Sequence, residues 1–192
     1  MTGIIHESSR GFATLNLTDE LFSKRELYFT SEVNTESCSE LIQQLRYLDG
    51  DSRDEIKLFI NSPGGGVDSG LAAYDMLRLI KSPVTTICMG TAASMGSILF
   101  LAGEKRLMLP HSRIMIHDPS FGGGSYAGKK PDELQSELDS LFKTRERLTQ
   151  IIVERTGQPI ESVLEKTRVD SYFTAEEAIA FGLATAIVED EI

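Results

Sequence analysis

The stretch TAASMGSILF, residues 91–100, places Ser94 in an otherwise small and apolar environment. A serine hydroxyl held at the start of a helix, beside free backbone amides, could act as a nucleophile. A serine that merely caps a buried helix explains the same letters, and for a lone serine this second interpretation is favoured. The motif G-x-S-x-G, which would strengthen the nucleophile hypothesis, is absent.

A nucleophilic serine needs a base, and the chain offers three histidines. His6 lies near the N-terminus and His111 follows a proline in an expected turn, whereas His117 ends the apolar segment RIMI and precedes a glycine-rich loop. His117 is therefore the candidate base. Asp118 is a poor partner for it, because neighbouring strand residues point to opposite faces. Asp170, in a polar turn, is the alternative carboxylate, but the sequence does not place it beside His117.

The segment NSPGGG, residues 61–66, follows an expected strand and carries three consecutive glycines. Glycine lets backbone N–H groups approach a ligand, so the segment could stabilise an oxyanion or bind phosphate. Neither G-K-[ST] nor a dinucleotide fingerprint is present, which weakens the phosphate interpretation. A simple tight turn remains an alternative.

The elements that must position these residues alternate between strands and helices, which predicts an α/β domain with largely parallel pairing. A glycine-rich loop is expected at 118–130, and the first sixteen residues are expected to be a mobile terminus. Helices are expected over 33–49, 69–81, 94–101, 131–157 and 174–182, and strands over 55–60, 84–90, 106–110, 113–117 and 183–188. Within 33–49, Leu41, Leu45 and Leu48 recur at helical spacing, and Thr174 with Glu177 three residues later predicts a capping box at the start of 174–182.

Composition narrows the class of protein. The chain has 192 residues, enough for one well-filled core, and a formal net charge of −10, which argues against nucleic acid and anionic membranes as partners. The chain has two cysteines and no C-x-x-C motif, which argues against a disulfide framework and against a structural zinc site. This cysteine usage favours a cytoplasmic protein. The uncharged segment 83–103 is interpreted as a buried strand and helix, because it is too polar for a membrane span. No secretory signal is expected at the N-terminus.

Several blocks together resemble the proteolytic subunit of the Clp proteases, the ClpP family. The resemblance extends from about residue 21 to residue 188. The blocks occur in the family's order, which makes the resemblance specific. They are FINSPGG (59–65), YDMLRLI (74–80), ICMGTAASMGS (87–97), LPHSRIMIHDP (109–119), ERTGQPIE (154–161) and FTAEEAIAFGL (173–183).

The resemblance implies a ClpP/crotonase-like spiral of repeated β-β-α units in a single domain, 1–192, with an axial N-terminal segment (1–20) and a protruding handle region (120–157). It implies that Ser94 is the nucleophile, His117 the general base and Asp170 the orienting carboxylate. The backbone amides of Gly65 and Met95 would form the oxyanion hole. Further substrate contacts are expected at Gly64, Gly66, Gly122, Gly123 and Gly124. No metal or organic cofactor is implied.

The same resemblance implies a serine endopeptidase that degrades unfolded polypeptides inside a chamber of two stacked heptameric rings. An AAA+ unfoldase such as ClpX, ClpA or ClpC would feed it, using ATP. Three departures indicate a divergent paralogue that could share a mixed complex: NLTDELF at 16–22, Lys57 in place of a docking tyrosine, and Arg168-Val169 before Asp170. Two alternatives stay open, a weakly active structural subunit of a mixed ring and an acyl-CoA enzyme of the crotonase fold.

Overall fold

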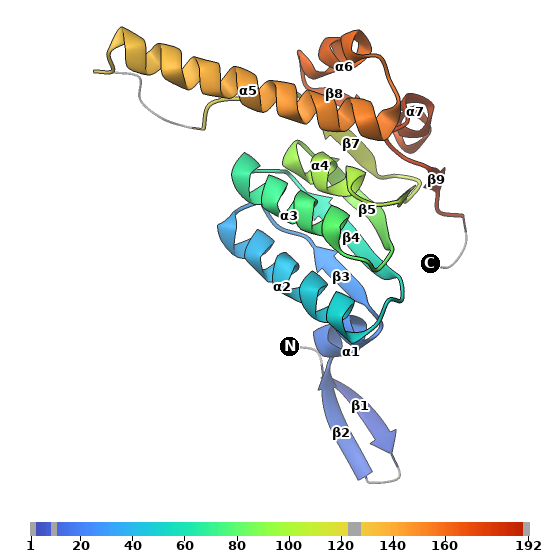
Figure 1. The fold of residues 1–192 in the computed structure, drawn as a ribbon. Helices are drawn as coiled ribbons and strands as arrows, with labels where there is room; N and C mark the ends of the chain where they lie inside the picture. The colour runs from blue at the N-terminus through green and yellow to red at the C-terminus, as the bar shows by residue number, and fades with distance from the viewer. Residues whose placement is uncertain (1–2, 9–10, 123–127, 190–192) are drawn as a thin grey trace.

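The structure, a computed structural model, describes residues 3–8, 11–122 and 128–189, with the side chains described from residue 16 onward. A twisted sheet forms the centre of the molecule, and helices pack against it (Figure 1). Among the described residues, this sheet contains β3 (Glu26–Phe29), β4 (Ile56–Ser62), β5 (Val84–Ala93), β6 (Lys105–Met108), β7 (Arg113–Ile116), β8 (Ser171–Phe173) and β9 (Ala186–Ile187).

The pairing is mostly parallel. β3, β4, β5, β6 and β9 follow one another in parallel, and β7 pairs in parallel with the far end of β5. β8 is the exception, because it runs antiparallel to β7. The predicted α/β fold of the ClpP type, with its parallel pairing and protruding helix, is confirmed.

The predicted helices are present with small shifts at their ends. The helix expected from residue 94 begins one residue later, so that Ser94 lies at its N-cap. The capping box predicted from Thr174 and Glu177 is also present. The helices are α1 (Leu17–Ser23), α2 (Thr35–Asp51), α3 (Val67–Leu79), α4 (Met95–Leu101), α5 (Pro131–Thr156), α6 (Ile160–Thr167) and α7 (Ala175–Phe181).

The structure adds elements that the pattern of the sequence did not predict. Residues 3–8 and 11–16, which belong to the terminus expected to be mobile, form two antiparallel strands of a hairpin, β1 (Gly3–Ser8) and β2 (Gly11–Asn16). The hairpin projects away from the sheet at the end where the chain begins (Figure 1). The short elements α1, β3, α6 and β8 were also missed, because each has too few residues to show a clear period.

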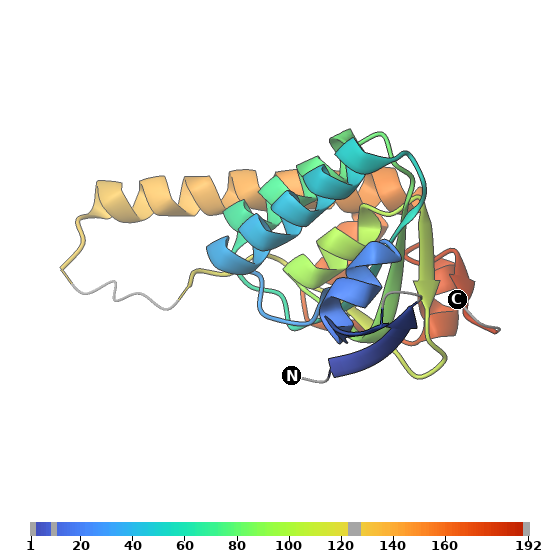
Figure 2. The ribbon, with the colours of Figure 1, turned by 90° about the horizontal axis from the view of Figure 1, so that it is seen from below.

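The core lies between the sheet and the α2–α3 layer. Leu41, Leu45 and Leu48 recur at helical spacing on α2 and are buried, as the sequence predicted. α5 enters this core only over its last turns, where Leu148, Ile151 and Ile152 are buried. Its first turns extend beyond the body of the molecule as an arm (Figure 2), which matches the handle expected within 120–157.

β5 bends and thereby contacts two different strands. Its first half pairs with β6, from Thr85 to Cys88, and its last three residues pair with β7. Gly90 lies between the halves with φ +154, and a Cβ there would lie 2.7 Å from Oδ1 of Asn61. The bend therefore needs glycine, and it directs the end of β5 toward the strand that carries His117.

Asp49 fastens the end of α2 to the turn before β5. One carboxylate oxygen accepts hydrogen bonds from the backbone amides of Lys81 and Ser82, at 3.0 and 2.8 Å, and it also contacts Arg53. The Arg53 contact and these amides hold the pKa of the Asp49 carboxyl well below its usual range.

We expect Asp49→Asn to lower the free energy of unfolding at neutral pH, where the native carboxylate is ionised. Because the folded-state pKa is depressed, the stabilisation is complete above the unfolded value, about 3.9, and is lost as the pH falls below it. The difference between wild type and variant, measured by urea unfolding from pH 7 to pH 3, should shrink on the acid side. A difference that stays constant over this range would contradict the prediction.

Candidate active site

Ser94 occupies the sharp turn between β5 and α4. Its backbone has φ 52 and ψ −123, a conformation that residues with a Cβ rarely adopt. Its amide donates to the carbonyl of Met115 on β7 at 2.9 Å, which fixes the turn against the neighbouring strand. The side chain makes no helix-capping hydrogen bond, so the capping interpretation of Ser94 is wrong.

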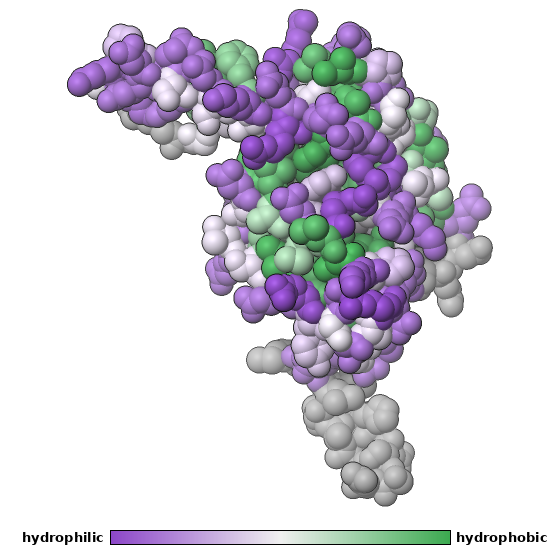
Figure 3. Space-filling model, viewed as in Figure 1, coloured by the Kyte–Doolittle hydropathy of each residue, from purple (hydrophilic) through white to green (hydrophobic). Residues whose placement is uncertain are grey.

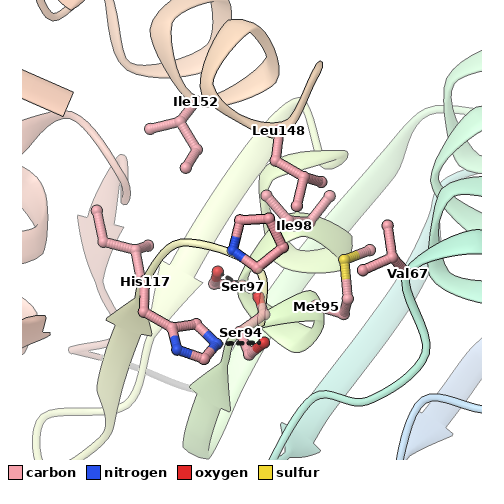
Figure 4. Close-up of a pocket in the computed structure, with 10 residues that line it drawn as sticks. Val67, Ser94, Met95, Ser97, Ile98, His117, Leu148 and Ile152 are labelled. Carbon is pink, nitrogen blue, oxygen red and sulfur yellow. Dashed lines mark hydrogen bonds between the residues drawn. The ribbon is translucent and has the colours of Figure 1, made fainter. Parts of the chain in front are cut away.

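The Ser94 hydroxyl instead faces the imidazole of His117. Ser94 Oγ and His117 Nε2 are 2.8 Å apart, and the two side chains point toward each other across the small gap between β5 and β7 (Figure 4). The pairing of Ala93 with Met115 explains this meeting, because the residues that follow each strand leave the sheet at the same edge. A hydrogen bond of this length is within the reach required between a nucleophile and its base.

Asp170 reaches the other ring nitrogen of His117. Its Oδ1 lies 3.2 Å from His117 Nδ1. The antiparallel register of β7 and β8 pairs Ile116 with Ser171, so the next pair outward is His117 and Asp170. With a proton on Nδ1 directed at this carboxylate, Nε2 is left as the acceptor for the Ser94 hydroxyl.

The glycine segment after β4 packs directly against Ser94. A Cβ on Gly64, where φ is +94, would lie 2.6 Å from Cβ of Ser94 and 3.0 Å from the nitrogen of Met95. Gly66 donates its amide to Val33, and the Gly64 carbonyl accepts from the Val33 amide. The amide of Gly64 also donates to Oγ of Ser62, at 3.2 Å, so the amides of both glycines are occupied, although Gly66 is exposed. Substrate contacts at Gly64 and Gly66 stay a prediction.

Two amides beside Ser94 have no hydrogen-bond acceptor within the part of the chain that the structure describes. Gly65 pairs with Val33 in an isolated parallel bridge, and the two hydrogen bonds of this bridge use the carbonyl of Gly64 and the amide of Gly66. The N–H of Gly65 itself therefore points away from Val33. The Met95 N–H belongs to the first turn of α4, where no intrahelical acceptor exists. Free backbone N–H groups of this kind can stabilise a negative oxygen.

A small apolar pocket opens next to the Ser94 hydroxyl. Its volume is about 30 Å³; Val67 lies on the side opposite His117, and Leu148 and Ile152 of α5 lie above the pair of Ser94 and His117 (Figure 4). A wider hollow of about 330 Å³ adjoins it, shares Val67 and Pro119 with it, and includes Gly122 in its lining. The pocket and the hollow together could receive an extended chain with one apolar side chain inserted.

The remaining candidates lie elsewhere. His111 is exposed in the turn before β7, and His6 lies in β1, where only the backbone is described. Asp118 does not contact its neighbour His117 and pairs with Arg145 instead, as the strand geometry led us to expect. Gly123 and Gly124 lie outside the described residues. Sequence reasoning missed β8, although the residues SYF before a helix cap are a weak strand signal.

Cys88 is buried in β5, and burial raises the pKa of its thiol, which disfavours the reactive thiolate. Over the described part of the chain, no group of three or more His, Cys, Asp or Glu side chains is arranged to hold a metal ion. None of the helices described is both long enough and apolar enough to cross a membrane.

The serine, imidazole and carboxylate from three separate segments have the spatial order of a Ser-His-Asp hydrolase, a class that recurs on unrelated folds. The family comparison narrows this class. A family model described as Clp protease matches residues 9–191, nearly the whole chain. The chain therefore belongs to the Clp protease family and is a ClpP-type protein.

We expect Gly64→Ala to destabilise the chain by about 1–3 kcal/mol, because the new methyl group meets Cβ of Ser94 and the carbonyl oxygen of Ala93, and the positive φ disfavours a side chain. Gly122→Ala is the matched control, since a Cβ there has no heavy atom within 4 Å. Denaturant unfolding of both variants tests this. Equal stability of the two would show that the close packing of Gly64 against Ser94 is not maintained in solution.

Proposed function

We propose that this chain is a serine endopeptidase in which Ser94, His117 and Asp170 form the catalytic triad. The observation that carries the proposal is the 2.8 Å contact between Ser94 Oγ and His117 Nε2, with Asp170 3.2 Å from the other ring nitrogen. The family match supports the same class of reaction.

The reaction follows from these positions. His117 Nε2 takes the hydroxyl proton while Ser94 Oγ attacks the peptide carbonyl carbon, and the carbonyl π electrons move to oxygen. Asp170 stabilises the resulting imidazolium through Nδ1–H. The tetrahedral oxyanion is placed against the amides of Gly65 and Met95. His117 then gives its proton to the leaving amine, and water attacks the acyl-enzyme by the reverse proton path.

The substrate is proposed to be an unfolded polypeptide or peptide, bound as an extended strand. The pocket beside Ser94 is lined by Val67, Met95, Leu148 and Ile152, which favours an apolar side chain next to the cleaved bond. The adjoining hollow lies along residues 119–122, where the substrate backbone would run. Ser94 provides the nucleophile, His117 the base and two backbone amides the donors to the oxyanion, so the proposal requires no metal or organic cofactor.

The assembly proposed is a pair of heptameric rings, homomeric or mixed with a second ClpP paralogue, fed by an AAA+ unfoldase in the cytoplasm. The family match and the projecting α5 support it. Hydrophobic residues lie among polar ones over α2 and α3 in the view of Figure 3. Tyr47 on α2 and Leu79 on α3 are exposed. Such side chains are common at surfaces that other chains cover.

Two other functions are distinguishable by experiment. A structural ring subunit with little activity alone would assemble but not react with a fluorophosphonate. An acyl-CoA enzyme would turn over an enoyl-CoA and not a fluorogenic peptide. His117 contacts both Ser94 and Asp170, and this arrangement favours the peptidase over both alternatives. Neither alternative needs a serine hydroxyl that is hydrogen bonded to a histidine.

We expect Ser94→Ala to abolish both fluorophosphonate labelling and peptide cleavage, and Asp170→Asn to lower kcat on the order of 10⁴-fold. Ser97→Ala is the control, because Ser97 lines the same pocket but donates its hydroxyl to the Ser94 carbonyl at 2.6 Å. The Ser97→Ala variant should still be labelled by the fluorophosphonate. Mass spectrometry of the labelled chain, alone and mixed with a second subunit, identifies the modified residue. Labelling that is retained in the Ser94→Ala variant would contradict the proposal.

The apolar pocket generates a prediction about specificity. Val67→Ala removes two methyl groups from its wall, so the ratio of kcat/KM for a phenylalanine substrate over an alanine substrate should rise on the order of 10-fold. Fluorogenic peptides that differ only at the residue before the cleaved bond provide the measurement. An unchanged ratio would mean that this side chain is bound elsewhere.

A further inference from the structure

Asp118 joins three elements around the proposed triad. Its Oδ2 lies 2.9 Å from Nε of Arg145 on the handle helix α5. Its backbone N–H donates to the carbonyl of Thr167, the last residue of α6, at 2.6 Å. Asp118 follows His117 directly, and Thr167 precedes Asp170 by three residues. Asp118 therefore connects the segment that carries His117 to the segment that leads to Asp170, and connects both segments to α5.

This cluster is largely shielded from solvent. The side chains of Asp118 and Arg145 are 27% and 29% exposed, and Thr167 is buried. Oδ1 of Asp118 and Oγ1 of Thr167 are buried without a hydrogen-bond partner in the described residues, and the Arg145 Nε–H is not aligned for a hydrogen bond with the nearby carboxylate. Buried polar atoms with incomplete partners cost free energy, so the pair is a poor device for stability alone.

The His117–Asp170 contact needs such a connection, because it is open to solvent. The Asp170 side chain is 63% exposed, so burial does not fix the carboxylate beside His117. The β7–β8 register holds the two residues on one side of the contact, through Ile116 and Ser171. The Asp118–Thr167 hydrogen bond holds them on the other side. The orientation of the imidazole therefore depends on both connections.

We propose that Asp118 and Arg145 are positioning residues: their ion pair anchors the His117–Asp118 and Thr167–Asp170 segments to α5, and so keeps His117 aligned between Ser94 and Asp170. This inference rests on the proposed function. Neither residue reaches the reacting atoms, so the pair acts through His117. An ion pair that only stabilised the fold would change unfolding without changing turnover in the folded enzyme.

The experiment compares Asp118→Asn, Arg145→Met, the double variant and Arg145→Lys in the full chain. Arg147→Met is the matched control, because Arg147 is an exposed arginine on the same helix. Hydrogen–deuterium exchange is followed in peptides covering 113–119 and 166–172. Peptide cleavage is measured on size-fractionated assemblies, so that each rate refers to intact enzyme.

Loss of the pair should speed exchange in both peptides and lower kcat about 10- to 100-fold, with KM within about twofold of wild type, because a misaligned base slows the chemical step. The double variant should be no slower than the slower single variant, Arg145→Lys should recover part of the rate, and Arg147→Met should resemble wild type. Unchanged exchange, or a lower melting temperature with an unchanged kcat, overturns the proposal.

The outcome is separable from that of the proposed function. A wild-type chain that neither reacts with a fluorophosphonate at Ser94 nor cleaves peptide, alone or with a second subunit, contradicts the proposed peptidase. In that case, hydrogen–deuterium exchange still tests whether the Asp118–Arg145 pair anchors the two segments. Faster exchange in Asp118→Asn and Arg145→Met, but not in Arg147→Met, supports the anchoring, and equal exchange in all variants contradicts it.

Discussion

The position of β7 between β5 and β8 is the constraint on which the candidate site depends. On one side, the pairing of Ala93 with Met115 brings the end of β5 level with the end of β7. On the other side, the pairing of Ile116 with Ser171 brings the residue before β8 level with the residue after β7. Ser94, His117 and Asp170 each stand just beyond one of these paired ends. A slip of one residue in either pairing would turn a side chain to the opposite face and separate the three.

Glycine makes this arrangement sterically feasible at two places. Gly90 lets β5 leave β6 and join β7, and Gly64 allows the turn after β4 to pack against Cβ of Ser94 and the carbonyl of Ala93. Ser94 itself adopts a positive φ in the sharp turn, which is tolerated because its amide is hydrogen bonded to Met115. The direction of the Ser94 hydroxyl toward His117 and the free amide of Met95 are consequences of the same turn.

The long periodic elements and the blocks of family resemblance were predictable from the sequence, whereas the assembly of the site was not. Leu41, Leu45 and Leu48 predicted a buried helix face, and this was confirmed. Asp170 could be paired with His117 only through the resemblance, because the three-residue strand β8 has no detectable period and its partner lies more than fifty residues away. The capping interpretation of Ser94 was wrong for a related reason: local sequence does not show that a histidine competes for the hydroxyl.

The departures from the family pattern fall outside the contacts that define the chemistry. Lys57 lies in β4 between β3 and β5, at the opposite end of that strand from the glycine turn. Arg168 is the C-cap residue of α6, and Val169 is 65% exposed. Among the described residues, no side-chain hydrogen bond or ion pair joins Lys57, Arg168 or Val169 to Ser94 or His117. The internal geometry of the site and the side chains at positions 57, 168 and 169 are therefore under separate physical constraints. The register of β5, β7 and β8 can keep the three side chains of the site together while Lys57, Arg168 and Val169 are substituted.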